Sequence, residues 1–199
     1  MSIITKYNRI SYIYDMMESL VEYLMFGKWR KQILSDLSGL VLDIGVGTGK
    51  NLKYYPDNCK IVGMDVSSKM LEHAKKRAEN LDNVSLFVMD GEHLAFENHS
   101  FDYVITTFVL CSIPDPVAAL KEMKRVCKPD GMVINMEHMK SKHAILSMIE
   151  DIFNPLTFGT MGVNINRKTV ENIKKAGLNK ISEQNLAIKD VFRLIKSKP

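Results

Sequence analysis

Short apolar segments alternate with amphipathic segments over most of the chain after residue 40. The apolar segments have the length of strands and are hydrophobic at nearly every position; they cover residues 40–44, 61–65, 84–89, 101–107 and 132–136. Between them, apolar residues recur at steps of three and four, as from Met70 to Ala78, which is typical of helices. Strands of this kind, separated by helices, indicate a parallel sheet that is covered on both faces. The pattern therefore predicts an α/β fold with a doubly wound sheet.

The two ends of the chain depart from this alternation. Apolar residues recur at helical spacing from Ile10 to Leu24, and a second short helix is predicted after Gly27. Residues 1–37 are therefore expected to form an N-terminal helical cap. The C-terminal part is expected to form a helix and two strands that pair as an antiparallel hairpin, over residues 167–176, 179–186 and 188–196.

Local signals mark the elements between these ends. Asp115 is a predicted N-cap, with Pro116 at the first helical position. A turn is predicted at residues 129–131, where the sequence is Pro-Asp-Gly. Residues 142–166 interrupt the rhythm with a predicted helix, an irregular Met- and Gly-rich loop (NPLTFGTMGVN) and Asn166 as the expected N-cap of the next helix. We predict a single domain over residues 1–199, with 142–166 as a lid-like insertion.

Composition and charge narrow the functional classes. The 27 Lys and Arg residues against 23 Asp and Glu residues give a net charge of +4 without a polybasic block, so no nucleic-acid partner is expected. The three widely spaced cysteines fit neither a disulfide framework nor a zinc site, and no metal is predicted. The chain also shows no secretory signal and no apolar run long enough to span a membrane. A reduced, cytoplasmic setting is therefore expected.

The first predicted strand runs directly into a glycine-rich turn, VLDIGVGTGKN. Gly45, Gly47 and Gly49 let the backbone turn sharply and approach a ligand closely. The helix expected after the turn would present free N–H groups to a carboxylate. Asp43 lies inside the strand, where it can meet an ammonium group. A tight turn or a nicotinamide site is the alternative interpretation, but Lys50 stands where the dinucleotide fingerprint has its third glycine.

A carboxylate marks the end of each of the first three strands. Asp65, twenty residues after Gly45, can accept two ribose hydroxyl protons. Asp90 and Gly91 can read the edge of an adenine through a side-chain acceptor and a backbone N–H. An amino-acid group, a ribose and an adenine are the three parts of S-adenosylmethionine, and the three carboxylates match them.

Taken in order, VLDIGVGTGKN, VGMDVSSKML, FVMDGEHLAFENHSFDYV, VLCSIPDP and VCKPDGMV resemble the successive motifs of class I S-adenosylmethionine-dependent methyltransferases. The similarity is greatest to the UbiE-type and phospholipid N-methyltransferase-like group, and it covers residues 7–197. The resemblance implies a Rossmann-like, seven-stranded, mostly parallel sheet of order 3-2-1-4-5-7-6 with an antiparallel last strand. It implies S-adenosyl-L-methionine as cofactor and S-adenosyl-L-homocysteine as product.

The resemblance also assigns residues to the cofactor. Asp43 and the three glycines would hold the methionine part, Asp65 the ribose, and Asp90 with Gly91 the adenine. The segment from Phe108 to Cys111 would line the floor beside the sulfonium. Further candidate contacts are Thr48, Asn51, Val66, Met70 and Glu92. Met70 has a stronger interpretation as a core residue at helical spacing, and Cys111 as a small core residue and not a nucleophile.

Methyl transfer from a sulfonium needs alignment, exclusion of water and an acceptor lone pair free of its proton. His138, after the fifth strand, is the first candidate base, because an imidazole with a pKa near neutrality can take a proton from an amine, thiol or phenol. A histidine that only caps a strand or contacts the lid is the alternative. Tyr14 and Asp15 are candidates to close over the cofactor or substrate, and a solvated helix face is the alternative for Asp15.

The acceptor is predicted from the apolar residues outside the sheet. The leading helix and residues 142–164 are rich in Met and Phe, whose adaptable packing favours an apolar or lipid-like acceptor. Phosphatidylethanolamine-type N-methylation ranks first, ahead of quinol C-methylation and of a small thiol or amine. A catalytically inactive, cofactor-binding module is the non-enzyme alternative. The oligomeric state is left open.

Contact with a membrane is a further hypothesis for the N-terminal part. Transient contact with a membrane surface would involve an interfacial cluster of aromatic and basic residues, namely Phe26, Lys28, Trp29, Arg30 and Lys31. The acidic residues of the leading helix weigh against it, and plain packing onto the sheet is the alternative. The chain is thus expected to be cytoplasmic, and a location at the periphery of a membrane is the alternative.

Overall fold

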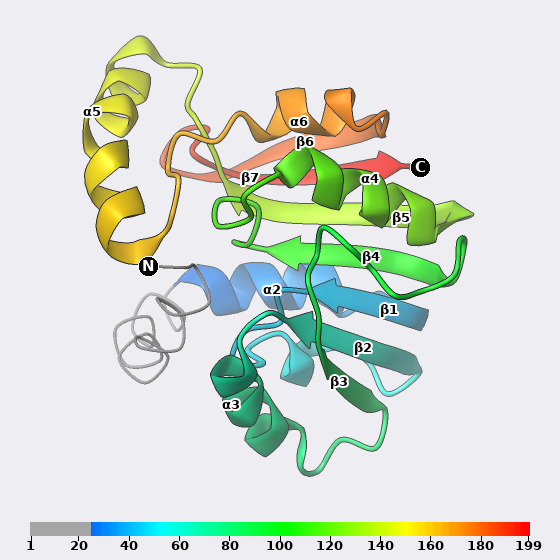
Figure 1. Ribbon diagram of the computed structural model, residues 1–199. Helices are drawn as coiled ribbons and strands as arrows, with labels where there is room; N and C mark the ends of the chain where they lie inside the picture. The colour runs from blue at the N-terminus through cyan, green and yellow to red at the C-terminus, as the bar shows by residue number, and fades with distance from the viewer. Residues whose placement is uncertain (1–24) are drawn as a thin grey trace. The chain divides into compact units, whose positions relative to one another are not determined.

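The computed structural model describes residues 25–199 and contains a seven-stranded sheet (Figure 1). The strand order is β3-β2-β1-β4-β5-β7-β6, which confirms both the α/β class and the predicted order. The chain divides into two compact units, one ending at Asp90 and the other starting at Gly91. Within residues 25–199, no helix is both long and apolar enough to cross a membrane. The predicted helix over residues 10–24, with Tyr14 and Asp15, lies outside the described residues.

The first unit contains three parallel strands with their connecting helices. Its elements are α2 (Gly27–Leu34), β1 (Gly39–Ile44), the 3-10 helix η2 (Leu52–Tyr54), β2 (Cys59–Asp65), α3 (Ser68–Ala78) and β3 (Val84–Val88). Ile44 pairs with Met64, and Asp65 pairs with Val88, so the carboxyl ends of the three strands lie along one edge. This alignment positions the strand-end carboxylates of the candidate site.

The first unit is held together by close packing between α3 and its strands. Ser67 caps α3, because its Oγ accepts a hydrogen bond from the N–H of Met70 at 3.2 Å. The apolar face of α3, which includes Met70 and Ala74, is buried. β2 has a glycine at position 63 because the side chain of Leu86 packs closely against its backbone: a Cβ on Gly63 would lie 2.7 Å from Cδ2 of Leu86.

The second unit continues the sheet with parallel and antiparallel strands. Its elements are β4 (Phe101–Thr107), α4 (Pro116–Val126), β5 (Cys127–His138), α5 (Ala144–Met161), α6 (Thr169–Lys175), β6 (Asn179–Ala187) and β7 (Phe192–Lys198). The predicted cap of α4 is confirmed, since Asp115 Oδ1 accepts hydrogen bonds from the N–H groups of Val117 and Ala118 at 3.0 Å each. β6 and β7 pair as the predicted antiparallel hairpin.

The predicted turn at residues 129–131 lies inside β5. Phe101 pairs with Cys127 and Tyr103 pairs with Met132, so the residues between these partners form a bulge. Gly131 permits the bulge, because a Cβ there would lie 2.7 Å from the carbonyl oxygen of Asp102. Pro129 and Gly131 therefore mark a bulge within β5. The sequence had instead predicted a turn before this strand.

The predicted Met- and Gly-rich loop is largely helical, and that prediction was wrong. α5 continues through Pro155 to Met161 and ends at Gly162, whose φ of 77° lies in the left-handed region. Proline has no N–H, so the carbonyl of residue 151, four residues before Pro155, lacks its helical donor. The helix nevertheless continues for six residues beyond this position.

The predicted helix over 167–176 begins later, at Thr169, with Lys168 at the N-cap position. Asn166 is therefore not the N-cap; its Nδ2 donates to Asp151 Oδ1 at 2.9 Å. Asn166 thus ties the segment before α6 to α5.

Candidate cofactor site

Three carboxylates of the first unit lie at the aligned carboxyl ends of its strands. Asp43 is the second-last residue of β1, Asp65 is the last residue of β2, and Asp90 lies two residues after the end of β3. The sequence predicted this grouping from the position of each residue relative to its strand. The structure brings the three acids to one edge of the same unit.

Asp43 is completely buried, and only one of its two carboxylate oxygens accepts hydrogen bonds from the described residues. Its Oδ2 accepts hydrogen bonds from Asn51 Nδ2 at 2.8 Å and from the Tyr55 hydroxyl at 2.9 Å. Its Oδ1 has no hydrogen-bond partner among the described residues. Burial raises the pKa of Asp43 from 3.8 to about 6, although the bonds from Asn51 and Tyr55 and the charge of Arg30 oppose this rise. A buried acceptor without a partner fits a positively charged donor such as an ammonium group.

Arg30 supports this arrangement from α2. Its guanidinium NH1 donates to Asn51 Oδ1 at 2.5 Å, and Asn51 in turn donates to Asp43. Arg30 is buried, so its place in the predicted interfacial cluster was wrong: its charge faces the protein interior. Sequence reasoning also missed Tyr55, because no local pattern links either residue to Asp43.

The glycine turn supplies space and backbone donors. Gly45, Gly47 and Gly49 all have positive φ, at 66°, 57° and 85°. The nearest atom to a Cβ placed on Gly47 would be the carbonyl oxygen of Gly45 at 3.9 Å, so this position is open. A Cβ on Gly49 would instead lie 3.0 Å from Cα of Ala74. Gly47 therefore leaves room for a ligand, whereas Gly49 lets the turn pack against α3.

The helix predicted after the glycine turn is only a short 3-10 helix, η2. Tyr55 after it is extended, and Pro56 follows, so no α-helix forms there. The expected helix N-terminus for a ligand carboxylate was therefore wrong. The buried side chains of Thr48 and Asn51 lie in this turn, and the carbonyl oxygen of Thr48 accepts a hydrogen bond from Arg77.

Asp65 is oriented by two backbone donors. Gly47 N–H donates to Oδ2 at 3.1 Å, and Ser67 N–H donates to Oδ1 at 2.8 Å. Burial raises the pKa of Asp65, and these two N–H groups act in the opposite direction. Because each oxygen has a further lone pair, the carboxylate can still accept two hydroxyl groups of a ribose.

The remaining predicted contacts of the first unit differ in exposure. Asp90 is exposed and Val66 is half-buried, as a residue at the rim of a site would be. Met70 is buried in α3, which agrees with its interpretation as a core residue. The adenine contacts of Asp90 and Met70 stay predictions.

In the second unit, Glu137 organises the segment after β4 and was missed by sequence reasoning. Its carboxylate accepts the N–H of Val109 at 3.0 Å, and the preceding Phe108 has a φ of 59°, which is rare for a non-glycine residue. Burial raises the pKa of Glu137 from 4.5 to about 7, while hydrogen bonds from Thr106, Val109 and Leu110 oppose this rise. Glu137 thus fixes the predicted floor segment that starts at Phe108.

His138 and Cys111 lie in the second unit as well. Burial lowers the pKa of His138 to about 4, against an opposing backbone contact with Asn164, and its Nε2 has no partner among residues 25–199. The histidine is therefore neutral near pH 7 with a lone pair available, but it is a weaker base than predicted. Burial raises the pKa of the Cys111 thiol to about 12, which supports its interpretation as a core residue.

Two more predicted contacts belong to the second unit. Gly91 is buried, and Glu92 Oε1 accepts the N–H of Asp115 at 3.0 Å. Glu92 therefore contacts the residue that caps α4, and its role toward a cofactor stays a prediction. Among the described residues, no group of His, Cys, Asp or Glu is arranged to hold a metal ion.

The residues of the first unit fit S-adenosylmethionine by their chemistry. The unpartnered Oδ1 of Asp43 suits the ammonium group, the open position at Gly47 suits close backbone approach, and Asp65 suits the ribose. The fit depends on features that a plain tight turn would not need, above all a buried carboxylate oxygen left without a donor.

Comparisons with known proteins indicate the same class of protein. The profile of the methyltransferase domain matches residues 42–135. A demethylmenaquinone methyltransferase of Staphylococcus aureus (strain MRSA252) is 37% identical over 139 residues, which are 66% of this chain and 58% of the relative. The chain thus spans a little over half the length of the curated relatives that it matches.

Solved structures share the fold at lower identity. An S-adenosylmethionine-dependent methyltransferase of Thermotoga maritima, described as a possible histamine N-methyltransferase, has a TM-score of 0.71, with 21% identity and 98% of each chain covered. The geranyl diphosphate C-methyltransferase of Streptomyces coelicolor has a TM-score of 0.67, with 13% identity over 86% of this chain and 80% of that chain. That protein was solved with S-adenosyl-L-homocysteine, Mg²⁺ and geranyl diphosphate.

The fold, the site and the matching domain place the chain among the class I S-adenosylmethionine-dependent methyltransferases. Within that class, it is similar in sequence to demethylmenaquinone methyltransferases, which are of the UbiE type. The predicted family, fold and cofactor are thereby confirmed.

Proposed function

We propose that this chain transfers the methyl group of S-adenosylmethionine to an apolar quinol, as the name of its demethylmenaquinone methyltransferase relative suggests. The observation that supports the methyl donor is the buried carboxylate of Asp43, with one unpartnered oxygen, beside the open glycine turn. The quinol as acceptor rests on the name of the relative. Lipid-like N-methylation, ranked first from the sequence alone, is the second candidate, because the exposed apolar residues of α5 favour any acceptor that carries acyl or prenyl chains.

The cofactor supplies a methyl carbon already activated by its sulfonium. Asp43 and Asp65 bind and orient the amino-acid and ribose parts, which aligns the methyl group for in-line displacement. Asn51 and Tyr55 hold Asp43 in place through its Oδ2, so Oδ1 keeps a fixed direction. The contribution of the first unit is thus binding and alignment and needs no covalent intermediate.

The hydroxyl proton of the acceptor needs a separate hydrogen-bond partner. We keep His138 in this role because its Nε2 lone pair is unpartnered and the ring is neutral near pH 7. With a pKa of about 4, His138 is neutral, and its Nε2 accepts a hydrogen bond from a quinol hydroxyl, which orients the quinol ring. The ring carbon of the quinol forms its bond to the methyl group as the sulfur–methyl bond breaks, and the displaced ring proton is released to solvent water. Glu137 positions the Phe108 segment and does not itself need to touch the acceptor.

The test is incubation with S-adenosylmethionine carrying a labelled methyl group and three acceptor sets, followed by mass spectrometry. The sets are a short-chain demethylmenaquinol, phosphatidylethanolamine vesicles, and a panel of small thiols and amines. We expect label on a ring carbon of the quinol, and less than a tenth of that turnover in the His138→Ala variant with cofactor affinity nearly intact. Label on the amine headgroup alone would favour the second candidate. Cofactor binding without turnover on any set would indicate a binding module.

A further inference from the structure

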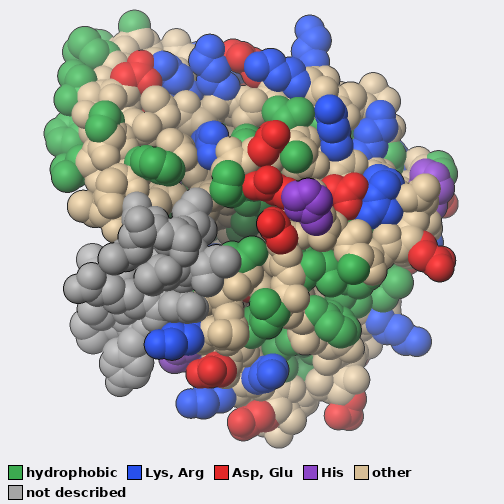
Figure 2. Space-filling view, in the orientation of Figure 1, with side chains coloured by type: hydrophobic (Ala, Val, Ile, Leu, Met, Phe, Trp, Pro, Cys, Tyr) green, Lys and Arg blue, Asp and Glu red, His purple; other side chains and the backbone are tan. Residues whose placement is uncertain are grey.

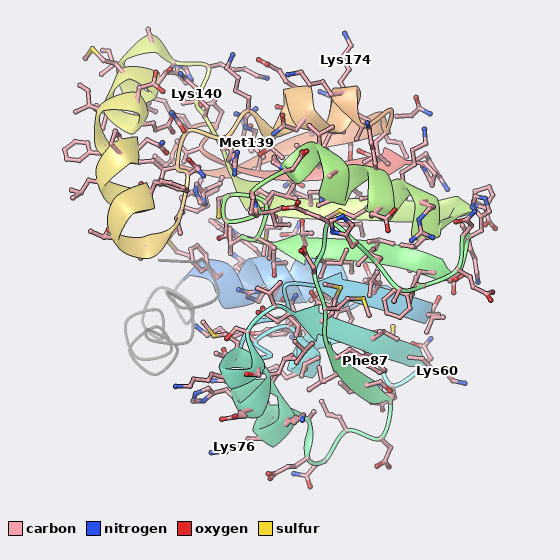
Figure 3. All side chains as sticks on the ribbon, in the orientation of Figure 1. Lys60, Lys76, Phe87, Met139, Lys140 and Lys174 are labelled. Atoms are coloured by element: carbon pink, nitrogen blue, oxygen red, sulfur yellow. The ribbon has the colours of Figure 1, made fainter. Side chains whose placement is uncertain are left out.

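The helix α5 has polar side chains on the side that faces the protein, whereas a surface helix usually turns its apolar side inward. Glu150 is buried and accepts the N–H of Ser141 at 2.9 Å, and Thr157 Oγ1 donates to the carbonyl of Val163 at 3.0 Å. Asp151 is drawn to the same side by an ion pair of 2.6 Å with Lys140, which Figure 3 labels between β5 and α5. These contacts fix the rotation of the helix about its axis.

The opposite side of α5 is apolar and exposed. Six of the eight exposed large apolar residues of α5 are 43–71% exposed and fall within an arc of about 140° at 100° per residue. The other two, Phe158 and Met161 in the last turn, lie outside this arc. We call the six residues within the arc the α5 stripe; it comprises Ile145, Met148, Ile149, Ile152, Phe153 and Leu156. Figure 2 shows hydrophobic side chains gathered over α5. The apolar face of a helix normally packs against the protein interior. Here polar contacts on the other side keep the apolar face exposed, which indicates that it binds an apolar partner.

The size of the stripe argues against a second copy of the chain as that partner. α5 has 18 residues and is about 27 Å long, so a face about 10 Å wide offers about 270 Å². A stable protein interface needs about 800 Å² from each partner. A bilayer requires no such area, because an interfacial helix buries only its apolar face among the acyl chains.

The surroundings of the stripe select the kind of bilayer. The turn between β6 and β7 lies beside the start of α5, because Asp190 accepts hydrogen bonds from Ser141 Oγ at 2.5 Å and from Lys142 N–H at 2.8 Å. This turn presents the exposed Ile188 and Lys189, and the side chain of Lys142 is 70% exposed.

The carboxylates nearby are each engaged by donors of the protein. Asp151 pairs with Lys140, Asp190 accepts from Ser141 and Lys142, and Glu183 takes ion pairs from Lys142, Lys180 and Arg193. Glu150 accepts the Ser141 N–H. The stripe itself carries no charge. Asp151 is 46% exposed but paired with Lys140, and Lys142 is 70% exposed but paired with Glu183. Lys189 is the exposed basic residue of the β6–β7 turn, and its charge complements anionic headgroups.

We propose that the α5 stripe, with Ile188 and Lys189 beside its first turn, docks on the surface of an anionic phospholipid bilayer. The helix lies in the plane of the interface with its polar side toward the protein. The proposal goes beyond the function proposed above and does not depend on it, because docking is measured without cofactor or acceptor.

The experiment is flotation of the full chain with vesicles of phosphatidylglycerol and phosphatidylcholine, and with vesicles of phosphatidylcholine alone. Ile152→Glu places a charge in the stripe, and Ile181→Glu on β6 is the matched control, since both isoleucines are more than half exposed. We expect Ile152→Glu to lose at least tenfold in vesicle binding and Ile181→Glu to change less than twofold. Lys189→Glu should weaken binding to the anionic vesicles only.

A probe gives an independent measurement. All three native cysteines are buried, so an environment-sensitive fluorophore on Ile152→Cys labels the stripe selectively, and one on Ile181→Cys serves as reference. We expect a blue shift with anionic vesicles at position 152 only. The proposal is overturned if the wild-type chain does not float, if the two glutamate variants bind equally, or if Ile152→Glu converts a dimer to a monomer without any change in flotation.

Discussion

Replacing Asp65 by asparagine tests the ribose assignment with the smallest change in shape. In the wild-type chain, the two carboxylate oxygens accept the N–H groups of Gly47 and Ser67 at 3.1 and 2.8 Å. An amide keeps one acceptor oxygen and turns a donor toward the other N–H group. One backbone donor therefore loses its partner, which should lower the free energy of unfolding by about 1–3 kcal/mol.

The effect of Asp65→Asn on cofactor binding is of similar size and can be measured separately. The wild-type carboxylate would form two charge-assisted hydrogen bonds to the ribose, and losing that charge should cost about 2 kcal/mol or more, or about 30-fold in Kd. Isothermal titration with S-adenosylmethionine and S-adenosylhomocysteine measures the affinity, and urea unfolding without ligand measures stability.

The matched control for this experiment is Asp82→Asn. Asp82 is exposed and precedes β3, at the opposite end of the strand from Asp90. The substitution removes the same charge from the same unit, so we expect wild-type affinity. If Asp65→Asn stays folded and binds both ligands within twofold of wild type, the carboxylate does not hold the ribose and the reasoning is refuted.

Three further variants probe the buried groups. Asp43→Asn should weaken the binding of S-adenosylmethionine about tenfold in calorimetry, because the amide can still accept from Asn51 and Tyr55 but no longer pairs with an ammonium group. The raised pKa of Glu137, about 7 against 4.5, favours the protonated form in the fold, so this contribution is complete below about pH 4.5 and is lost as the pH rises through 7. Wild-type stability in urea should thus fall by up to about 3 kcal/mol relative to Glu137→Gln between pH 4.5 and 8, and parallel profiles would contradict this. Gly49→Ala should lower the free energy of unfolding by about 1–3 kcal/mol, since its Cβ would crowd Ala74 at a φ of 85°.

The parts of the fold that the sequence predicted are those with local physical causes. β4 was predicted to the residue; its run of aromatic and β-branched residues begins directly after the polar segment 97–100. The start of α4 was predicted from the pairing of Asp115 with Pro116, and both hydrogen bonds of that cap form. The strand order was implied by resemblance, since periodicity alone does not say which strands are neighbours.

The failed predictions share a different cause. The sequence Pro-Asp-Gly at residues 129–131 and the proline and two glycines of NPLTFGTMGVN are typical of turns. The first segment nevertheless lies in a strand, and most of the second lies in a helix. At residues 129–131 a distant contact decides the conformation, because residue 131 packs against the carbonyl of Asp102. In the second segment the contact is local, because Thr157 Oγ1 donates to the carbonyl of Val163, six residues later. In both places, contacts of the folded chain override a composition that is typical of turns.

The site shows the same division between local and distant information. The acids at the strand ends follow from strand position, but Arg30, Tyr55 and Glu137 act through contacts made only in the folded chain. Arg30 reaches Asp43 through Asn51 across 13 residues of sequence, and a charged residue near aromatic ones reads as surface until that contact is seen. Buried polar partners are therefore the part of a site that sequence patterns detect least well.

The partial satisfaction of Asp43 links the stability of the fold to its ligand. A buried carboxylate that keeps one oxygen without a donor costs free energy in the empty site, and the raised pKa of Asp43 is the sign of that cost. A ligand that brings an ammonium group to Oδ1 removes the cost only in the folded state, so binding stabilises the chain in addition to occupying the site. Because Asn51 and Tyr55 both donate to Oδ2, only Oδ1 lacks a donor. An ammonium group is therefore favoured at one defined position beside Asp43. The same geometry favours the cofactor over the proposed quinol acceptor at this position: a quinol hydroxyl can donate a hydrogen bond to Oδ1 but brings no positive charge, so it offsets less of the cost than an ammonium group does.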